Sequence, residues 1–374
     1  MITIIYSILF LYFLAMAWVF YGFQKLRYFN HNNSVAKNTF SIVVPFRNEE
    51  KQLPHLLQSL LKIDYDETKF EVLFVDDESN DASVQIINDG LKNAHINYHI
   101  LTNIRYSNSP KKDAISQALK KAQNDWIVTT DADCIVPRKW LSILDAFIQK
   151  KDPKMVCMPV SIIQKKSLLY QFQYFDGLSL QTVTKGGFGN QKPLLSNGAN
   201  LAYKKKTFFE VAGYIDNDIY ASGDDLFLME KIRELYPTKI LYLKNREVTV
   251  LTHCVDSWKS VTQQRIRWAS KTKYLKEPML TILGGITLLT NLALLVSFIC
   301  CFIFPLDIAY FLSVIVIKIL LDTVILVSET QFLRQKFSLL YLWISTFIYS
   351  VVVVWVVFNS IKGGYEWKDR SFKN

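Results

Sequence analysis

Long apolar runs at both ends of the chain constrain its fold more than any other feature. Residues 1–24 contain no charged side chain. Three further apolar runs, of which only the middle one contains charges, follow near the C-terminus: Met279–Phe304, Ile308–Ser328 and Phe337–Ile361. A helix of about 20 apolar residues crosses the ~30 Å hydrocarbon core of a bilayer. We therefore predict a transmembrane anchor over residues 1–24 and about three membrane segments within residues 279–361.

The charges that flank these runs indicate the orientation of the chain. Lys25 and Arg27 follow the first run rather than precede it, which favours an uncleaved anchor over a cleaved signal peptide. Because Lys and Arg prefer the cytoplasmic side, residue 25 onward is expected inside. Three full spans would then leave the C-terminus outside, whereas the basic tail of residues 362–374 favours the inside. A re-entrant or interfacial hairpin among the three segments would reconcile the two.

The polar middle of the chain, residues 38–257, alternates strand-like and helix-like segments. Apolar β-rich runs at Phe40–Pro45, Phe70–Val75 and Trp126–Thr130 are separated by segments with apolar residues at helical spacing. This alternation predicts an α/β fold with a mostly parallel sheet that helices cover on both faces. In such sheets ligands bind beyond the carboxyl ends of the strands.

Carboxylates gather at those expected strand ends, where Glu49, Asp76, Asp77, Asp131 and Asp133 each follow a strand by a few residues. Asp131 and Asp133 suit a hard divalent cation such as Mg²⁺ or Mn²⁺, which completes its shell with phosphate oxygens and water. The alternative is a solvated turn. Asp76 and Asp77 suit the donors of a nucleobase and a ribose, although a helix N-terminus also favours acidic residues.

A further acidic pair, Asp224 and Asp225, follows Ser222-Gly223 and precedes a helical run. One of the two carboxylates is suited to act as a general base that deprotonates an acceptor hydroxyl. Capping of the helix N-terminus is the alternative role.

A basic, aromatic stretch precedes the second membrane block. Residues 258–277 carry six basic side chains interleaved with tryptophan and tyrosine. Such a helix lies readily at an anionic membrane surface, and Gln264, Arg267 and Trp268 within it also suit a diphosphate and a sugar ring. Nucleic acid is excluded as a partner despite the net charge of +10, because the basic residues cluster beside membrane segments and the sequence contains no nucleic-acid-binding motif.

Taken in order, these segments resemble a membrane-bound family 2 glycosyltransferase with the GT-A fold. The matching motifs run along residues 40–275 in the order Val44-Pro45-Phe46-Arg47-Asn48-Glu49-Glu50, Val75-Asp76-Asp77-Glu78-Ser79-Asn80-Asp81, Lys111-Lys112, Thr130-Asp131-Ala132-Asp133, Asn197-Gly198-Ala199-Asn200-Leu201-Ala202, Gly213-Tyr214, Gly223-Asp224-Asp225 and Gln264-x-x-Arg267-Trp268. The last motif is shared by ceramide-glucosyltransferase-like enzymes and polysaccharide synthases. The tail segment Glu366-Trp367-Lys368-Asp369-Arg370 is similar to a Trp-Lys-Gly-Arg element of the former, with Asp369 in place of the glycine.

The resemblance implies a role for each matching position. The residues implied to contact the nucleotide-sugar are Pro45, Arg47, Glu49, Asp76, Asp77, Lys112 and Asp131. Asp133, with Asp131, is implied to bind the metal. Asp225, with Asp224 beside it, matches the inverting general base, although the family more often has Thr-Glu-Asp there. Gln264, Arg267 and Trp268 match the residues that hold the acceptor end and the leaving diphosphate.

The expected function is therefore an inverting, metal-dependent transfer of a sugar from a UDP-sugar to a lipid-linked or membrane-associated acceptor, in envelope glycan or glycolipid synthesis. Residues 38–257 are expected to form the catalytic domain, on the cytosolic side of a bacterial cytoplasmic membrane. Residues 258–277 are expected to form an interfacial helix. A processive polysaccharide synthase and a non-catalytic membrane scaffold are the alternatives.

Overall fold

The computed structural model describes residues 2–31, 35–218, 220, 222–303, 308–362, 365–367 and 370–372. In the predicted basic tail of residues 362–374 the structure describes β11 (Tyr365–Trp367), which pairs antiparallel with β12 (Arg370–Phe372). The chain divides into two compact units. The α/β unit contains Arg27–Ser161 and Leu195–His253, and the helical unit contains Met1–Leu26, Ile162–Leu194 and Cys254–Asn374.

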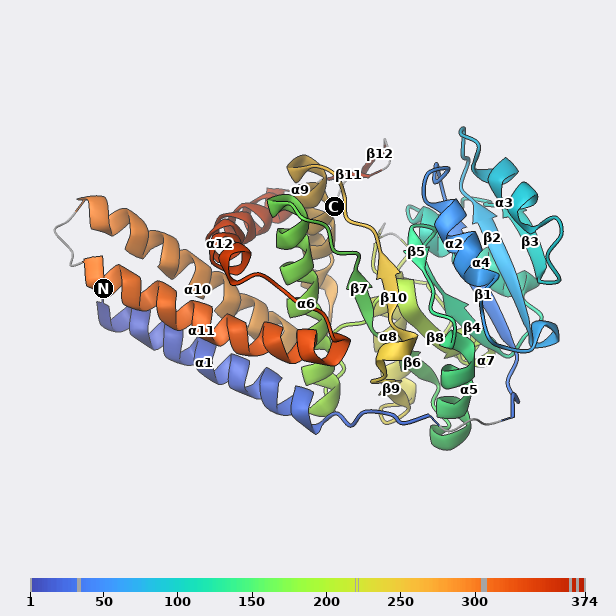
Figure 1. The fold of residues 1–374 in the computed structure, drawn as a ribbon, viewed down its shortest axis with the longest axis horizontal. Coiled ribbons are helices and arrows are strands. Elements are labelled where there is room, and N and C mark those ends of the chain that lie inside the picture. The colour runs from blue at the N-terminus through green and yellow to red at the C-terminus, as the bar shows by residue number, and fades with distance from the viewer. Residues whose placement is uncertain are drawn as a thin grey trace. The chain divides into compact units, whose positions relative to one another are not determined.

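The α/β unit is built around a seven-stranded sheet in the order β3-β2-β1-β4-β8-β6-β9 (Figure 1). Its strands are β1 (Phe40–Phe46), β2 (Phe70–Asp76), β3 (Asn97–Thr102), β4 (Trp126–Thr129), β6 (Met155–Cys157), β8 (Leu201–Lys204) and β9 (Ile240–Tyr242). β1 pairs in parallel with β2 and β4, and β2 with β3, whereas β8 runs antiparallel to β4 and β6. The mostly parallel α/β sheet predicted from the sequence is therefore confirmed.

Short elements and helices complete this unit. A smaller sheet has the order β5-β10-β7, with β5 at Cys134–Ile135, β7 at Val160–Ile162 and β10 at Val250–Thr252. The helices are α2 (Leu53–Leu60), α3 (Ser83–Leu91), α4 (Pro110–Lys121), α5 (Trp140–Lys151), α7 (Lys205–Glu210) and α8 (Asp224–Leu235), with 3₁₀ turns η1 (Glu67–Lys69), η2 (Gly198–Asn200) and η3 (Arg246–Val248).

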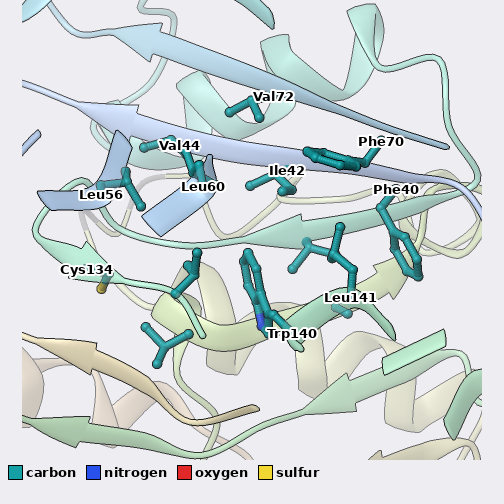
Figure 2. Close-up of a cluster of buried hydrophobic side chains, with 14 of the residues drawn as sticks. Phe40, Ile42, Val44, Leu56, Leu60, Phe70, Val72, Cys134, Trp140 and Leu141 are labelled. Carbon is teal, nitrogen blue, oxygen red and sulfur yellow. The ribbon is translucent and has the colours of Figure 1, made fainter. Parts of the chain in front are cut away.

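The packing of the α/β core explains why the sequence of β1 is almost continuously apolar. Figure 2 shows Phe40, Ile42 and Val44 of β1 in the same cluster of side chains as Leu56 of α2 and Trp140 of α5. The intervening residues of β1 are buried as well, because the parallel strand is covered on both faces. Each fully buried aliphatic side chain contributes about 1.5–3 kcal/mol to stability, so this central strand is fixed rigidly. Its carboxyl end gives the functional site a firm base.

Among its described residues, the helical unit contains four helices that are long and apolar enough to cross a membrane: α1 (Ile2–Lys25), α10 (Pro278–Ile303), α11 (Ile308–Leu333) and α12 (Leu339–Lys362). It also contains α6 (Leu168–Gly189), α9 (Trp258–Ser270) and the turn η4 (Thr272–Tyr274). The predicted anchor and three C-terminal apolar segments are thus present as helices. The charges of Lys318 and Asp322 in the middle of α11 are paired, since Lys318 Nζ donates to Asp322 Oδ2 at 2.6 Å and Tyr12 donates to Asp322 Oδ1 at 2.5 Å.

Helix α6 packs among the apolar helices α1, α11 and α12. Its crossing with α1 depends on glycine, because a Cβ on Gly22 would lie 2.0 Å from the Gly186 carbonyl oxygen. Further along α6, the fully buried Lys185 ammonium pairs with Glu329 of α11 at 2.6 Å. Although α6 contains the charged residues Asp176 and Lys185, both are neutralised by ion pairs inside this unit.

Candidate active site

The loops that follow β1 and β2 are tied together at the carboxyl edge of the sheet. Arg47 Nη1 donates to the backbone carbonyls of Asp77 and Glu78, both at 2.7 Å. Asn48 and Glu78 both have left-handed backbone conformations, with φ of 52° and 60°, which non-glycine residues adopt rarely. Ser79 Oγ accepts from the Asn48 amide at 3.0 Å. Because several hydrogen bonds hold these strained turns, they present a preformed rim at the sheet edge.

Asp77 is buried in this rim and surrounded by donors. Its Oδ1 accepts from Asn103 Nδ2 at 2.8 Å and lies 3.9 Å from Arg105 Nε. The exposed fraction of Asp77 is 5% and that of Asn103 is 6%. Asp76, at the end of β2, accepts instead from the Ser79 amide at 3.0 Å through Oδ1. Of the two adjacent carboxylates, Asp77 is thus the one fixed by side-chain donors.

Asp131, Asp133 and Cys134 follow β4 and offer ligand atoms that all lie within 4.8 Å of one another. Burial, followed by the charges of Asp133 and Asp131, raises the pKa of the Cys134 thiol. Because metals bind the thiolate rather than the thiol, the two carboxylates are the better ligands. Carboxylate oxygens fit Mg²⁺ or Mn²⁺, so the donor set agrees with the cation expected from the sequence.

Lys111, the second residue of α4, joins two of the acidic segments. Its ammonium lies 2.7 Å from Asp131 Oδ1 and 3.4 Å from Asp224 Oδ2. Burial alone would lower the pKa of Lys111, but Asp131 and Asp224 outweigh it and hold that pKa above its ordinary value. The ammonium therefore stays charged and brings the loop after β4 next to the N-terminus of α8.

Lys112, the neighbouring residue that the sequence singled out, is placed differently. It is 1% exposed, and its ammonium donates to the carbonyls of Asn217 at 2.6 Å and Tyr220 at 2.8 Å. It also lies over the Phe227 ring, 4.8 Å from the centroid. Lys112 thus supports the loop before α8, whereas Lys111 is the lysine among the carboxylates. The sequence motif contained both, and no periodicity signal distinguished them.

The motif Asn197-Gly198-Ala199-Asn200 forms the floor beneath this cluster. Asn197 Oδ1 accepts from the Ala199 amide and starts the turn η2. Asn200 is fully buried, where it accepts from Trp140 Nε1 at 2.9 Å and donates to the Pro159 and Val248 carbonyls. A Cβ on Gly198 would lie only 2.7 Å from Asp224 Oδ2. Gly198 therefore leaves room for the Asp224 carboxylate, which a larger residue at this position would contact.

Asp224 and Asp225 open helix α8 after Gly223, whose φ of 88° favours glycine. Asp225 is 8% exposed, and its Oδ2 accepts from the Gly198 amide at 3.3 Å while Oδ1 accepts from the Leu226 amide at 2.8 Å. Both carboxylates therefore border η2, with Asp224 held by Lys111 and Asp225 held by backbone amides.

His253, which follows β10 of the smaller sheet, did not stand out in the sequence. In the antiparallel pair of β10 and β5, Thr252 is opposite Cys134, so His253 follows the last pair on the side of Asp133. Its ring lies 5.6 Å from that of His55 on α2. A single histidine with no motif around it gave no signal before the register was known.

The remaining residues that the sequence singled out lie at the end of β1 and on α9. Pro45 and Glu49 lie within and just beyond β1, next to the rim described above. Gln264, Arg267 and Trp268 lie on α9, in the helical unit. There the guanidinium carbon of Arg265 lies 4.2 Å from the centroid of the Trp268 ring, and Arg265 Nη1 donates to Gln264 Oε1 at 2.5 Å.

Comparisons with known proteins agree with this fold. Poly(ribitol-phosphate) beta-N-acetylglucosaminyltransferase TarS of Staphylococcus aureus is 29% identical over 201 residues, which cover 51% of this chain and 32% of TarS. Poly-beta-1,6-N-acetyl-D-glucosamine synthase of Staphylococcus epidermidis is 23% identical over 269 residues, which cover 69% of this chain and 62% of the synthase. The chain thus spans less than two thirds of the length of either relative.

Among solved structures, mannosyltransferase PcManGT from Pyrobaculum calidifontis, in complex with GDP-Man and Mn²⁺, has the same fold. It superposes with a TM-score of 0.60 at 14% identity, covering 96% of this chain and 98% of its own. A sequence profile of Glycosyl transferase family 2 matches residues 41–212, a range that contains the rim, Lys111 and the acidic residues after β4. Residues 41–212 therefore form a family 2 glycosyltransferase domain.

Proposed function

We propose that this protein is an inverting, metal-dependent glycosyltransferase that moves a sugar from a UDP-sugar to a lipid-linked or membrane-associated acceptor. The observation that carries the proposal is the cluster in which Lys111 joins Asp131 and Asp224 at the carboxyl edge of the sheet. Three chain segments converge there, and two of them, with Lys111 and Asp131, lie in the range that matches family 2. N-acetylglucosamine is the first sugar to test, because it is named for both TarS and the S. epidermidis synthase.

The donor would bind along the rim. Asp77, oriented by Asn103, faces the uracil in this proposal, and Arg47 keeps the surrounding backbone in place. Asp133 and Asp131 would hold the divalent cation. The bound cation would supply positive charge to the diphosphate of the donor. Lys111 would supply a second positive charge close by, since its pKa keeps it protonated.

Asp225 is the proposed general base, and it would take the proton of the acceptor hydroxyl as that oxygen attacks the anomeric carbon. Attack opposite the departing UDP inverts the configuration. Asp224 is the alternative base, but its ion pair with Lys111 favours a role in holding the site together. By the sequence motif alone, Gln264, Arg267 and Trp268 are proposed to bind the acceptor end and the leaving diphosphate.

Release of UDP by the detergent-solubilised full-length protein tests the proposal. A panel of UDP-sugars that begins with UDP-N-acetylglucosamine is offered with Mn²⁺ or Mg²⁺, with and without a total membrane lipid extract. Wild type is expected to release UDP from one sugar, and Asp133→Ala and Asp225→Asn to lose that release. Asp64→Asn, which removes only an exposed pair with Arg138, is the matched control. Metal-independent release, or full release by Asp225→Asn, would overturn the assignment.

A processive polysaccharide synthase is the second candidate, because the S. epidermidis relative makes a polymer of N-acetylglucosamine. The same assay distinguishes the two when the product is separated by size. A single glycolipid band supports transfer to a lipid, and a ladder or smear of long products supports polymerisation.

A further inference from the structure

Side chains of α6 contact the segment that leads into and contains the Gln264-x-x-Arg267-Trp268 motif at several positions. Tyr170 donates to Asp256 Oδ1 at 2.5 Å, and the rings of Phe172 and Trp258 lie 5.2 Å apart. Gln173 makes a reciprocal pair with the backbone of Val255, donating to its carbonyl at 2.9 Å and accepting from its amide at 3.0 Å. The start of α9 is thereby fixed against the first half of α6.

The last contact of this series reaches the motif itself. Asp176, 6% exposed on α6, forms an ion pair with Arg265, whose side chain is 11% exposed. Gln173 and Asp176 are three residues apart and so lie on the same face of α6. One face of α6 therefore holds both Val255, three residues before α9, and Arg265 in the middle of α9.

Arg265 also contacts two residues of the motif. Its Nη1 donates to Gln264 Oε1 at 2.5 Å, and its guanidinium carbon lies 4.2 Å from the centroid of the Trp268 ring. Arg265 occupies a variable position of the motif and was assigned no role by the resemblance. In the structure its guanidinium contacts both Gln264 and Trp268.

We propose that Arg265, anchored by Asp176, is a positioning residue that orients Gln264 and Trp268 for the transfer reaction. This inference rests on the proposed function for its kinetic consequence, but its structural part stands without it. A planar guanidinium can pair with a carboxylate along one edge, donate to an amide with another and stack on an indole with its face. Lysine can keep the ion pair with Asp176 but cannot stack as a plane, so Arg265→Lys separates anchoring from positioning.

The first measurement does not need activity. The emission of Trp268 is isolated as the difference between each protein and the same protein carrying Trp268→Phe, and its quenching by acrylamide is measured in detergent. Arg265→Lys is expected to raise the quenching constant of that difference by about twofold, because the indole loses the guanidinium that covers it. Asp176→Asn is expected to act in the same direction, and Asp176→Glu to restore wild-type quenching.

The second measurement separates positioning from stability. In UDP release from UDP-N-acetylglucosamine with a total membrane lipid extract, Arg265→Lys is expected to lower kcat by roughly tenfold to a hundredfold. The KM for the donor should change by less than about threefold. Lys185→Ala is the control, since it breaks the buried pair with Glu329 in the second half of α6 without touching α9. It should lower Tm more than Arg265→Lys does and leave kcat unchanged at a temperature below its Tm.

Unchanged Trp268 quenching in Arg265→Lys would overturn the inference, whatever the activity. So would a loss of kcat in Lys185→Ala as large as that in Arg265→Lys, because the effect would then follow general destabilisation. If wild type releases no UDP from any sugar, the proposed function fails, and the quenching measurement still decides whether Arg265 orients Trp268.

Discussion

The substitution Gly198→Ala tests the arrangement of the candidate site with a single methyl group. Gly198 lies in η2, fixed from behind by the buried Asn200. An added Cβ would lie 2.7 Å from Asp224 Oδ2 and 3.2 Å from Lys111 Nζ. Both are the ends of flexible side chains, so the backbone can stay where it is while the two charged groups move.

The size of that movement sets the expected effect. Ordinary contacts of a Cβ begin near 3.4 Å, so the Asp224 carboxylate must retreat by about 0.7 Å from its 2.7 Å position, whereas Lys111 must shift by only a few tenths of an ångström. A misplacement of about 1 Å can cost a hundredfold in rate, and we therefore expect kcat for UDP release to fall by about tenfold or more. The free energy of unfolding should change by less than about 1 kcal/mol, because flexible side-chain ends absorb the strain.

The assay compares kcat for UDP release with Tm in the same detergent preparation. Gly285→Ala on α10 is the matched control, because a Cβ there meets no atom within 4 Å. Wild-type kcat in Gly198→Ala would refute the idea that Asp224 and Lys111 need this space. A fall in Tm of many degrees would refute it as well, because the loss of activity would then reflect a disturbed fold.

Other substitutions test separate parts of the site. Asp133→Asn should lower Mn²⁺-dependent UDP release by about a hundredfold and weaken the Mn²⁺ dependence, as a titration of UDP release against Mn²⁺ would show; unchanged Mn²⁺ dependence would remove Asp133 from the metal site. Lys111→Met should reduce kcat by about tenfold or more with a small change in Tm, whereas Lys112→Met should cost about 1–3 kcal/mol in urea unfolding because two backbone carbonyls lose their donor. Hydrogen bonds from Lys204 and Lys239 hold the pKa of Asp152 below its usual range, so its contribution to stability is present above the usual aspartate pKa and is lost as pH falls through the lowered one. Asp152→Asn should therefore lower stability at pH 7 by less than about 1 kcal/mol after solvent screening, and this difference should vanish at pH values below the lowered pKa; a difference that persists in acid would contradict the assignment.

The central strands and the acidic residues at their ends could be predicted because both follow from local patterns. The runs at Phe40–Pro45 and Phe70–Val75 became β1 and β2 within one residue of the predicted ends. A parallel strand buried on both faces must be apolar along its length. Because β2 and β4 both run parallel to β1, Asp76 at the end of β2 and Asp131 just after β4 lie at the same edge of the sheet.

Contacts between distant segments could not be predicted in the same way. Lys111 and Lys112 have the same sequence environment, yet one helical step of about 100° sends one side chain to Asp131 and the other to the loop before α8. His253 comes opposite Asp133 in register only because β10 pairs with β5. Both assignments need the relative placement of elements, about which periodicity gives no information.

The packing of α6 among the apolar helices could not be predicted for the same reason. Asp176 and Lys185 make α6 look like a helix of a water-soluble domain, because an isolated charge costs several kcal/mol to bury. The partner of Asp176 is Arg265, 89 residues further along the chain. The partner of Lys185 is Glu329, 144 residues further along the chain. Each charge of α6 can therefore be buried only after the C-terminal part of the chain has supplied its partner. It follows that the packing of α6 depends on the C-terminal part of the chain.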